Sequence, residues 1–307
     1  MSAIRIATRG SLLALTQSRW VKAELQRRHP GLEVELIEFK TTGDVKLAQS
    51  LTAIGGKGAF TKELEDALLN NLADFAVHSL KDLPTSLPEG LVLACTPARE
   101  ETGDVMLLRD RAWATDPFAT LPQGATVGSS SPRRKAQLLA RRPDLKVVEF
   151  RGNVDTRLRK LSEGQADAIL LARAGLKRLG RLPDPATGEF GIHALDAPGW
   201  LPAVGQGCLG IEARLADTRV WQMLEDLHDN AAWAEVSAER AFLRVLGAGC
   251  SAPVGAQARY SNGRVSLQVA IYAADGTAAA GAKGEADAQE AEELGERLAH
   301  EVMKQAP

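Results

Sequence analysis

The sequence predicts an α/β protein with open, mostly parallel sheets. Short apolar stretches of strand length run repeatedly into a polar turn and then into a segment of helical spacing. Basic residues stand beyond the ends of several of these stretches. Because ligands bind beyond the carboxyl ends of parallel strands, the same pattern predicts one anion-binding crevice.

Composition limits the function. A chain of 307 residues is long enough for two or three domains, and 45% hydrophobic with 25% charged residues is ordinary for a globular protein. A formal net charge of -2 argues against a general nucleic-acid binder, so local clusters of arginine indicate a confined anionic ligand. The first residues have no signal-peptide pattern and no apolar run reaches membrane-spanning length, so we expect a cytoplasmic protein that needs no membrane.

The three cysteines are widely spaced and follow neither a disulfide nor a metal-ligand pattern, so we expect no metal site. Cys95 and Cys208 stand in apolar surroundings and are predicted to be small core residues. Cys250 lies in a loop of glycine, alanine and serine in which no neighbour is bulky enough to bury it. It is therefore the cysteine that we expect to do chemistry.

The first elements predict an anion site. A strand from Ile4 to Ala7 and a turn carrying Arg9 and Ser11 lead into an amphipathic helix that ends near His29. The N-H groups at such a helix start can bind an anion, although a surface role for Arg9 taken alone is the simpler interpretation.

A second strand, from Val34 to Phe39, precedes a polar loop. The glycine-rich segment from Ile54 to Phe60 includes Lys57 and leads into a helix that Thr61 can cap. The segment lacks the phosphate-loop pattern, and it is either a mobile element that closes over a ligand or a plain flexible loop.

The stretch from Phe75 to Pro84 predicts a buried strand that delivers Lys81 and Asp82 to its carboxyl end. A solvated Lys-Asp turn is the simpler alternative for this stretch alone. A strand from Leu91 to Ala94 follows, and the charged segment from Arg99 to Asp104 is typical of a crossing between domains.

Three basic turns follow successive strands of the second predicted domain. After the strand that begins at Thr126, Ser131 can cap a helix with Pro132 at its first position. Hydroxyls, free N-H groups and two arginines then meet at one helix start, which suits a carboxylate or a phosphate. The first turn carries Ser129, Ser131, Arg133 and Arg134. The second follows a strand from Val147 to Phe150 and carries Arg151, Gly152, Asn153 and Arg157. The third follows a strand from Ala168 to Ala172 and carries Arg178.

The remaining chain predicts a strand that returns to the first domain, followed by a third domain. Residues 181–199 have the composition of a long irregular connection, and Leu201 to Glu212 is placed back in the first domain as a returning strand. A helix from Asp229 to Leu246 precedes the Cys250 loop. Two alternating segments and a final helix, Val254 to Tyr260, Val265 to Tyr272 and Ala288 to Lys304, suggest a small α+β domain.

Seven ordered motifs together resemble the porphobilinogen deaminases, also called hydroxymethylbilane synthases. The motifs run from Arg5 to Arg9, Gly55 to Gly58, His78 to Pro84, Gly128 to Arg134, Arg151 to Arg157, Leu201 to Gly207 and Gly249 to Gly255. The resemblance covers nearly the whole chain. It implies two lobes like a type II periplasmic binding protein plus a small C-terminal α+β domain. The first lobe would comprise residues 1–101 and 200–226, the second lobe residues 102–199, and the C-terminal domain residues 227–307.

The resemblance also implies a reaction. Four porphobilinogen molecules lose ammonia and are joined head to tail on a dipyrromethane cofactor, which a thioether links to the cysteine matching Cys250; hydrolysis then releases the linear tetrapyrrole. Asp82 matches the catalytic carboxylate that stabilises the cationic intermediate. The residues matching cofactor-binding and substrate-binding positions are Arg9, Ser11, Lys81, Ser129, Ser131, Arg133, Arg134, Arg151, Gly152, Asn153, Arg157, Arg178 and Gln206, and Lys57 and Phe60 match the loop.

Two other functions are compatible with parts of this pattern. A solute-binding protein would use the two lobes to hold a small dicarboxylate, but it would be exported and would need neither a reactive cysteine nor a third domain. A transferase acting on a phosphorylated substrate would use the arginine-lined helix starts. Neither accounts for Asp82 and the Cys250 loop together, and we expect a monomeric enzyme.

Overall fold

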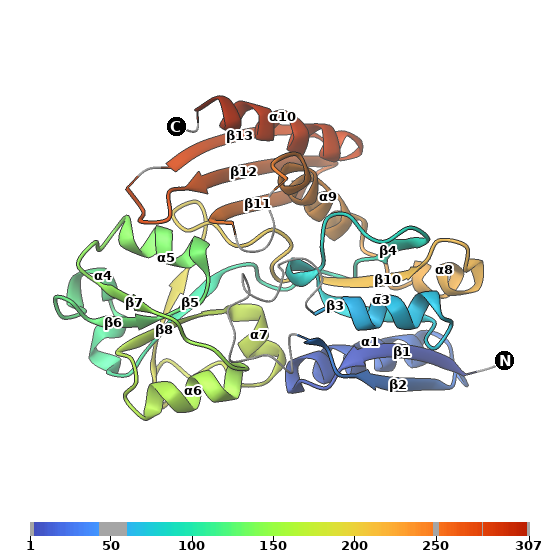
Figure 1. The fold of residues 1–307 in the computed structure, drawn as a ribbon, viewed down its shortest axis with the longest axis horizontal. Coiled ribbons are helices and arrows are strands. Elements are labelled where there is room, and N and C mark those ends of the chain that lie inside the picture. The colour runs from blue at the N-terminus through green and yellow to red at the C-terminus, as the bar shows by residue number, and fades with distance from the viewer. Residues whose placement is uncertain (1–2, 43–59, 248–251, 278, 306–307) are drawn as a thin grey trace.

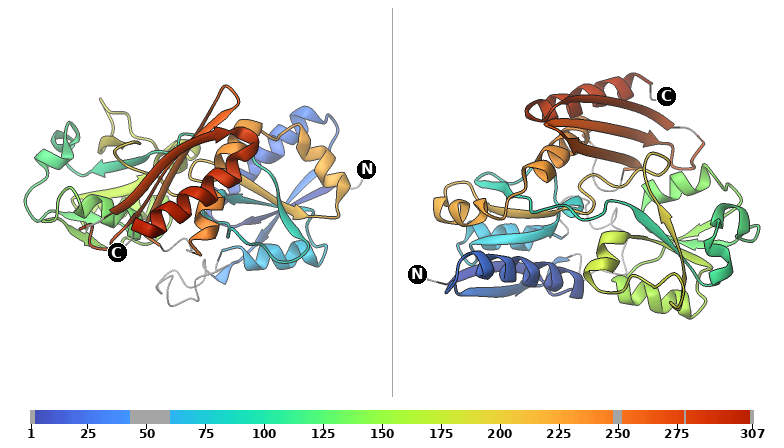
Figure 2. Two further views of the ribbon diagram at one scale, coloured as in Figure 1. Left: turned by 90° about the horizontal axis from the view of Figure 1, so that it is seen from above. Right: turned by 180° about the vertical axis from the view of Figure 1, so that it is seen from behind.

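The computed structural model describes residues 3–42, 60–247, 252–277 and 279–305, and they form two α/β lobes and a third, α+β domain (Figure 1). The two lobes lie side by side, and the third domain crosses above the junction between them (Figure 2).

The first lobe contains a five-stranded sheet of order β2-β1-β3-β10-β4. Its strands are β1 Ile4–Arg9, β2 Val34–Phe39, β3 Phe75–Ser79, β4 Leu91–Cys95 and β10 Leu209–Arg214. Strands β1, β2 and β3 are parallel, and β10 lies antiparallel between β3 and β4. The prediction that the chain returns to the first lobe as a strand is confirmed, although the strand begins at Leu209 rather than at Leu201.

The second lobe repeats this arrangement with the order β7-β6-β8-β5-β9. Its strands are β5 Asp104–Leu108, β6 Thr126–Gly128, β7 Lys146–Val148, β8 Ala168–Ala172 and β9 Gly191–Leu195. The strand that follows each crossing, β5 or β10, runs antiparallel beside the three parallel strands. The expected α/β class with two related lobes is confirmed.

Residues 181–199 are not wholly irregular, so that prediction is wrong for their second half. β9 pairs antiparallel with β5 along its whole length. Its sequence, Gly191 to Leu195, is short and interrupted by a histidine, and the pairing with β5 supplies the order that its own composition does not.

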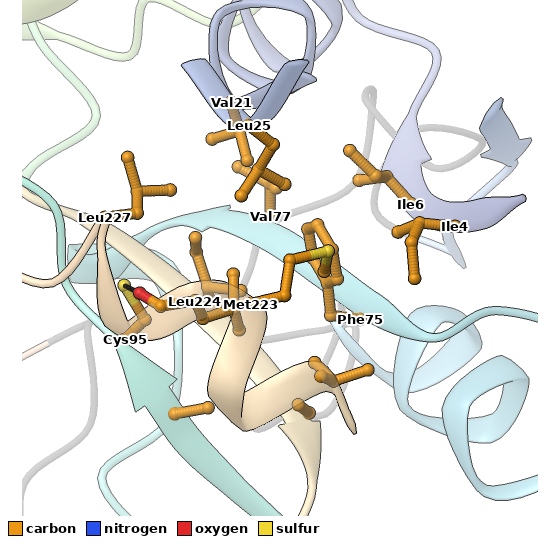
Figure 3. Packing of buried hydrophobic residues seen from close by; sticks show 14 of the residues in the cluster. Ile4, Ile6, Val21, Leu25, Phe75, Val77, Cys95, Met223, Leu224 and Leu227 are labelled. Carbon is orange, nitrogen blue, oxygen red and sulfur yellow. Dashed lines mark hydrogen bonds between the residues drawn. The ribbon is translucent and has the colours of Figure 1, made fainter. Parts of the chain in front are cut away.

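Helices cover both faces of the lobe sheets. The first lobe has α1 Leu12–Arg28, α3 Lys62–Leu69 and α8 Thr218–Glu225, with the short helix η1 Leu80–Asp82; the second has η2 Arg111–Ala114, α4 Pro117–Thr120, α5 Pro132–Leu139, α6 Val154–Ser162 and α7 Arg173–Arg178. Figure 3 shows Val21 and Leu25 of α1 packed over Phe75 and Val77 of β3, with Leu224 of α8 beside them. Burying each such side chain contributes about 1.5–3 kcal/mol to folding.

The third domain packs two helices on a three-stranded antiparallel sheet of order β11-β12-β13. Its elements are α9 Asn230–Val245, β11 Val254–Ser261, β12 Arg264–Tyr272, β13 Ala279–Asp287, η3 Ala288–Glu290 and α10 Ala291–Gln305. The predicted α+β class is confirmed, but sequence reasoning missed β13, whose alanines, glycines and charged residues have low strand propensity. Gly276 has a φ of +79°, and a Cβ there would lie 2.5 Å from the Ala136 carbonyl oxygen of α5, so the β12–β13 turn approaches the second lobe closely.

The chain crosses between the lobes twice, at residues 96–103 (the first crossing) and 196–208 (the second crossing). A buried ion pair attaches the third domain to both crossings. Glu239 of α9 accepts bonds from Arg99 Nη1 and Nη2, both at 2.9 Å. The same carboxylate accepts the backbone N-H groups of Gly205 and Ala258, both at 2.8 Å. Burial opposes a charge on Arg99, but Glu239 and Glu235 outweigh it and hold the pKa of Arg99 above its ordinary value.

We expect Glu239→Ala to lower the free energy of unfolding by about 3–5 kcal/mol, because it leaves the buried Arg99 guanidinium without its main partner. Urea unfolding measures the change. Glu292→Ala is the control, since Glu292 pairs with the exposed Arg244 at 2.9 Å and such a pair contributes about 0–1 kcal/mol. Equal destabilisation by the two substitutions would contradict this role for Glu239.

Candidate active site

A cavity of about 580 Å³ lies between the two lobes and is lined by residues of both. Its walls come from the end of β1 and the start of α1, from η1, from the first turns of α5, α6 and α7, and from the second crossing. Helices α1 and α7, one from each lobe, lie side by side at this junction (Figure 1). A separate hollow of about 450 Å³ on the third domain, lined largely by acidic residues, draws nothing from either lobe.

Strand β3 delivers Lys81 and Asp82 to the cleft, as the sequence predicts. The strand end is fixed on several sides. Ser79 Oγ accepts a bond from Gln17 Nε2 of α1 at 2.8 Å, and the Leu80 N-H donates to the Cys208 carbonyl oxygen at 3.0 Å. His78, one residue before Ser79, lies buried with its Nε2 atom 3.0 Å from Glu212 Oε2 of β10. The side chain of Asp82 is exposed in the cleft.

The ammonium of Lys81 lies in an enclosed, strongly cationic place. Its Nζ atom is 3.4 Å from Gln206 Oε1 of the second crossing. Burial, aided by the nearby Arg134 and Arg133 and opposed by Asp82 and Asp104, lowers the pKa of Lys81 to about 8. Lys81 is therefore partly neutral at mildly alkaline pH in the ligand-free cleft.

The turn between β1 and α1 places Arg9 and Ser11 on the cleft. The guanidinium carbon of Arg9 lies 4.3 Å from the centre of the Phe60 ring, which also lines the cleft. Ser11 caps α1, because its Oγ accepts the Ala14 N-H at 3.3 Å. Arg9 and Ser11 therefore lie together on one wall of the cleft.

The paired arginines of α5 differ in whether they reach the cleft. Arg134 lines the cleft, whereas Arg133 is not among the described lining residues and donates to the Leu201 carbonyl oxygen at 2.7 Å. Ser131 caps α5 as predicted, with its Oγ accepting the Arg134 N-H at 3.4 Å. Neither Ser129 nor Ser131 lines the cavity. Their neighbour Ser130, which sequence reasoning passed over, does.

Helices α6 and α7 bring the other basic residues to the same cavity. Arg151, Gly152, Asn153, Arg157 and Arg178 all line it. Asn153 caps α6 by accepting the Thr156 N-H at 2.9 Å. Arg151 pairs with Glu149 at 2.9 Å, Arg157 Nε donates to the Gly152 carbonyl at 2.9 Å, and Arg178 Nη2 donates to the Gly207 carbonyl at 2.7 Å.

Cationic groups outnumber acidic groups in this cavity. Its described lining includes seven basic side chains, Arg9, Lys40, Lys81, Arg134, Arg151, Arg157 and Arg178, and two acidic ones, Asp82 and Asp155. Burial, aided by Arg134 and Arg151 and opposed by Asp82, lowers the pKa of Arg157 to about 10. The arrangement suits a ligand that carries several carboxylates.

Sequence reasoning missed Gln17 and Ser79, which line the cavity as a hydrogen-bonded pair. Gln17 is buried on the same face of α1 as Ala14, Val21 and Leu25. A polar residue on an apolar helix face is the signal that could have found it.

The cysteine predictions are confirmed where the structure tests them. Cys95 and Cys208 are buried free thiols, and burial raises the pKa of each to about 12. Cys250 and Lys57 lie outside the described residues. Among the residues that the structure describes, no group of three or more His, Cys, Asp or Glu side chains could hold a metal ion.

Two family models together match most of the chain. The model described as porphobilinogen deaminase, dipyromethane cofactor binding domain, matches residues 4–222, and that described as porphobilinogen deaminase, C-terminal domain, matches residues 233–304. The chain belongs to the porphobilinogen deaminase family. The recognition made from the sequence motifs is thereby confirmed.

Relatives in the porphobilinogen deaminase family align over nearly full length. The porphobilinogen deaminase of Desulforudis audaxviator is 48% identical over 299 residues, which are 97% of this chain and 94% of the relative. That of Geobacter sulfurreducens is 44% identical over 304 residues, 99% of this chain and 92% of the relative. That of Nitratidesulfovibrio vulgaris is 52% identical over 258 residues, 84% and 78% of the two chains.

A solved structure, the VFT2 domain of Bordetella pertussis BvgS, aligns with 73% of this chain and 86% of its own at 20% identity and a TM-score of 0.43. No conclusion depends on so weak a likeness. Within the described ranges, no helix is both long and apolar enough to cross a membrane.

We expect Lys81 to titrate far below an ordinary lysine in this porphobilinogen deaminase family member without ligand, because of its burial among arginines. Trace labelling with acetic anhydride over a pH series, read by peptide mass spectrometry, should give a midpoint near pH 8 for Lys81. Lys62 is the internal control, since it is exposed and its pairing with Asp66 raises its pKa above the ordinary value. A Lys81 midpoint as high as that of Lys62 would contradict the described environment.

Proposed function

We propose that this chain deaminates four porphobilinogen molecules and joins them head to tail on a covalently held dipyrromethane primer, releasing hydroxymethylbilane and ammonia. The observation that carries this proposal is the cleft, in which Asp82 faces a surplus of arginine and lysine side chains from both lobes. Each pyrrole ring carries an acetate and a propionate, which are the groups that such cations bind.

Asp82 is proposed as the catalytic carboxylate. Loss of ammonia from porphobilinogen leaves a cation, and a carboxylate beside it stabilises the charge that develops in the transition state. Asp82 is delivered by a rigid strand end and is exposed in the cleft, so it can accept hydrogen bonds from pyrrole N-H groups. Neighbouring Lys81 supplies a cation for a ring carboxylate on the same turn.

The residues present fit the dipyrromethane cofactor. We propose that Lys81, Arg134, Arg151, Arg157 and Arg178 hold its carboxylates, and that Arg9 and Ser11 face the incoming substrate. When bound, the cofactor supplies the free pyrrole carbon on which the chain grows. A cavity of about 580 Å³ lies within the range of ligand pockets, and its cationic surplus matches the four carboxylates of two linked rings.

The other binding roles remain proposals of the same kind. Asn153, Gly152 and Gln206 line the cleft and offer neutral donors, and Phe60 offers an aromatic face. We also propose roles for Ser129, Ser131, Arg133 and Lys57. Arg133, Ser129 and Ser131 act from outside the described lining by shaping the start of α5.

We propose that the first domain comprises residues 1–101 and 200–226, the second residues 102–199, and the third residues 227–307. The three separate sheets support this division. We further propose a monomer that works in the cytoplasm. The free thiols of Cys95 and Cys208 support a reducing compartment.

We expect the freshly purified protein to weigh more than its sequence by two linked pyrrole units, and the Cys250→Ser variant to lack this excess. Intact-protein mass spectrometry measures both. Cys95→Ser and Cys208→Ser are matched controls that should keep the excess, since both thiols are buried and have raised pKa values. If wild-type protein shows no adduct even after incubation with porphobilinogen, the solute-binding alternative is favoured.

We expect Asp82→Asn to lower the rate of elongation on the order of a hundredfold or more, because it removes the charge that stabilises the cation. The rate of ammonia release from porphobilinogen measures the effect on cofactor-loaded, folded protein. Asp155→Asn is the comparator and should lose much less, since Asp155 pairs with Arg181 at 3.2 Å. Near-normal turnover by loaded Asp82→Asn would rule out the assigned role.

A further inference from the structure

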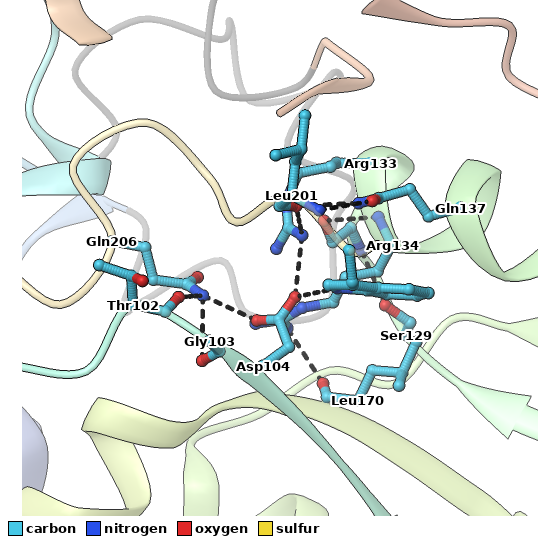
Figure 4. Close-up of polar contacts among 12 residues, drawn as sticks. Thr102, Gly103, Asp104, Ser129, Arg133, Arg134, Gln137, Leu170, Leu201 and Gln206 are labelled. Carbon is cyan, nitrogen blue, oxygen red and sulfur yellow. Dashed lines mark hydrogen bonds and ion pairs between the residues drawn. The ribbon is translucent and has the colours of Figure 1, made fainter. Parts of the chain in front are cut away.

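A fully buried carboxylate, Asp104, lies at the point where the first crossing enters β5. Four donors surround it (Figure 4). Arg133 Nη1 lies 2.8 Å from Oδ2 and Arg134 Nη2 lies 2.7 Å from Oδ1. Trp200 Nε1 donates to Oδ2 at 2.8 Å, and Gln206 Nε2 donates to Oδ1 at 2.8 Å. Each oxygen therefore accepts two hydrogen bonds.

These four donors come from different parts of the molecule. Arg133 and Arg134 belong to the first turn of α5 in the second lobe, whereas Trp200 and Gln206 belong to the second crossing. Only Arg134 and Gln206 of the four line the cleft. Asp104 itself does not reach the cleft, so any effect on a ligand must pass through these two side chains.

The bond to Asp104 fixes which way the Gln206 amide points. Gln206 Nε2 donates both to Asp104 and to the Thr102 carbonyl oxygen, the latter at 2.7 Å. An amide nitrogen is a donor only, so the other end of the amide, Oε1, must face away from these acceptors. Oε1 lies 3.4 Å from Lys81 Nζ. A continuous polar path thus runs from Asp104 to a lysine of the first lobe.

Arg134 is held in a comparable way. Its Nη2 bonds to Asp104 and its Nη1 donates to the Leu170 carbonyl oxygen of β8 at 3.0 Å. These two fixed contacts set the plane of the guanidinium before any ligand arrives. Preorganised donors bind better than flexible ones, because their ordering costs nothing further on binding.

The negative charge of Asp104 is also needed to offset the cations around it. Arg133, Arg134 and Lys81 are three cations close together, and the two arginines lower the pKa of Lys81. Burial opposes ionisation of Asp104, but Arg133 and Arg134 outweigh it and hold the pKa of Asp104 well below its ordinary value. Without this negative charge, two buried guanidinium groups would repel each other.

We propose that Asp104 is a positioning residue for the cleft, which sets the guanidinium of Arg134 and the amide of Gln206, and through that amide the ammonium of Lys81. It does not touch the ligand. The proposal rests on the proposed function for its kinetic consequences, whereas its effect on Lys81 does not depend on that function.

The first experiment compares Asp104→Asn with Asp74→Asn. Asp74 is a matched control, because it is also buried and paired with arginines, Arg5 at 3.2 Å, Arg219 at 3.0 Å and Arg214 at 3.7 Å, but it precedes β3 at the end opposite η1. Both variants should be destabilised. We expect Asp104→Asn to raise KM for porphobilinogen and to lower kcat/KM on the order of tenfold to a hundredfold, because Arg134 and Lys81 then misplace the bound cofactor that the incoming substrate must meet.

A purely structural role predicts a different result. Partial unfolding reduces the amount of active enzyme and hence the apparent kcat, but it leaves KM unchanged. We expect the Asp74→Asn variant to behave in this way. If cofactor-loaded Asp104→Asn keeps the wild-type KM, the proposal is wrong.

A double substitution covers the case in which Asp104→Asn does not fold. Asp104→Asn with Arg133→Met removes one charge of each sign and so keeps the net charge of the buried cluster. It is compared with Arg133→Met alone, in which Asp104 still holds Arg134 and Gln206. We expect the double variant to have the higher KM, and equal KM values in the two proteins would overturn the proposal.

The pH response of Lys81 gives a readout that does not need turnover. Asp82 and Asp104 raise the pKa of Lys81, while Arg134 and Arg133 lower it. With every protein compared in the Cys250→Ser background, which the proposed function leaves without cofactor, removing the Asp104 charge should therefore shift the acetic anhydride labelling midpoint of Lys81 to lower pH than in the parent, with no shift in Asp74→Asn. If the wild-type protein has no deaminase activity, the proposed function fails while this shift still tests Asp104. An unchanged Lys81 midpoint in the folded variant would contradict the path through Gln206.

Discussion

Charge buried at the junction of the lobes is the constraint on which the rest of the structure depends. Arg99 and Glu239 are almost fully buried there, and so are Asp104 and the paired arginines of α5. An isolated buried charge costs several kcal/mol, so burying each of these groups destabilises the fold unless its partner remains in place. The partners belong to different segments, and the crossings, α5 and α9 are therefore held in one arrangement. That arrangement determines where the walls of the cleft stand.

The repeated strand order explains why distant residues meet in this cleft. In each lobe, three parallel strands end on the same side, and the antiparallel strand that follows a crossing completes the sheet. The turns after β1, β3, β6, β7 and β8 consequently face the space between the lobes. Arg9 and Arg178, far apart in sequence, reach the same cavity by this route.

Local signals made much of this predictable. The caps Ser11 and Ser131 and the strand that delivers Asp82 follow from residue type and order within a few positions. β9 was not predictable in this way, because its order comes from pairing with β5. The two arginines of α5 show the same limit. Both guanidinium groups reach Asp104, but only Arg134 also lines the cleft, and the order of residues alone does not reveal which of the two does.

The buried cations of the cleft destabilise the folded protein when no ligand is bound. Lys81 has a pKa of about 8 there, below its ordinary value of 10.5, so its charge opposes folding at neutral pH and that cost fades as pH rises from about 8 to 10.5. A bound carboxylate reverses the effect, because an anion beside Lys81 and Arg157 favours their charged forms. Binding of such a ligand to the folded state alone must also stabilise it. The same buried cations that weaken the empty protein therefore attract a substrate rich in carboxylates.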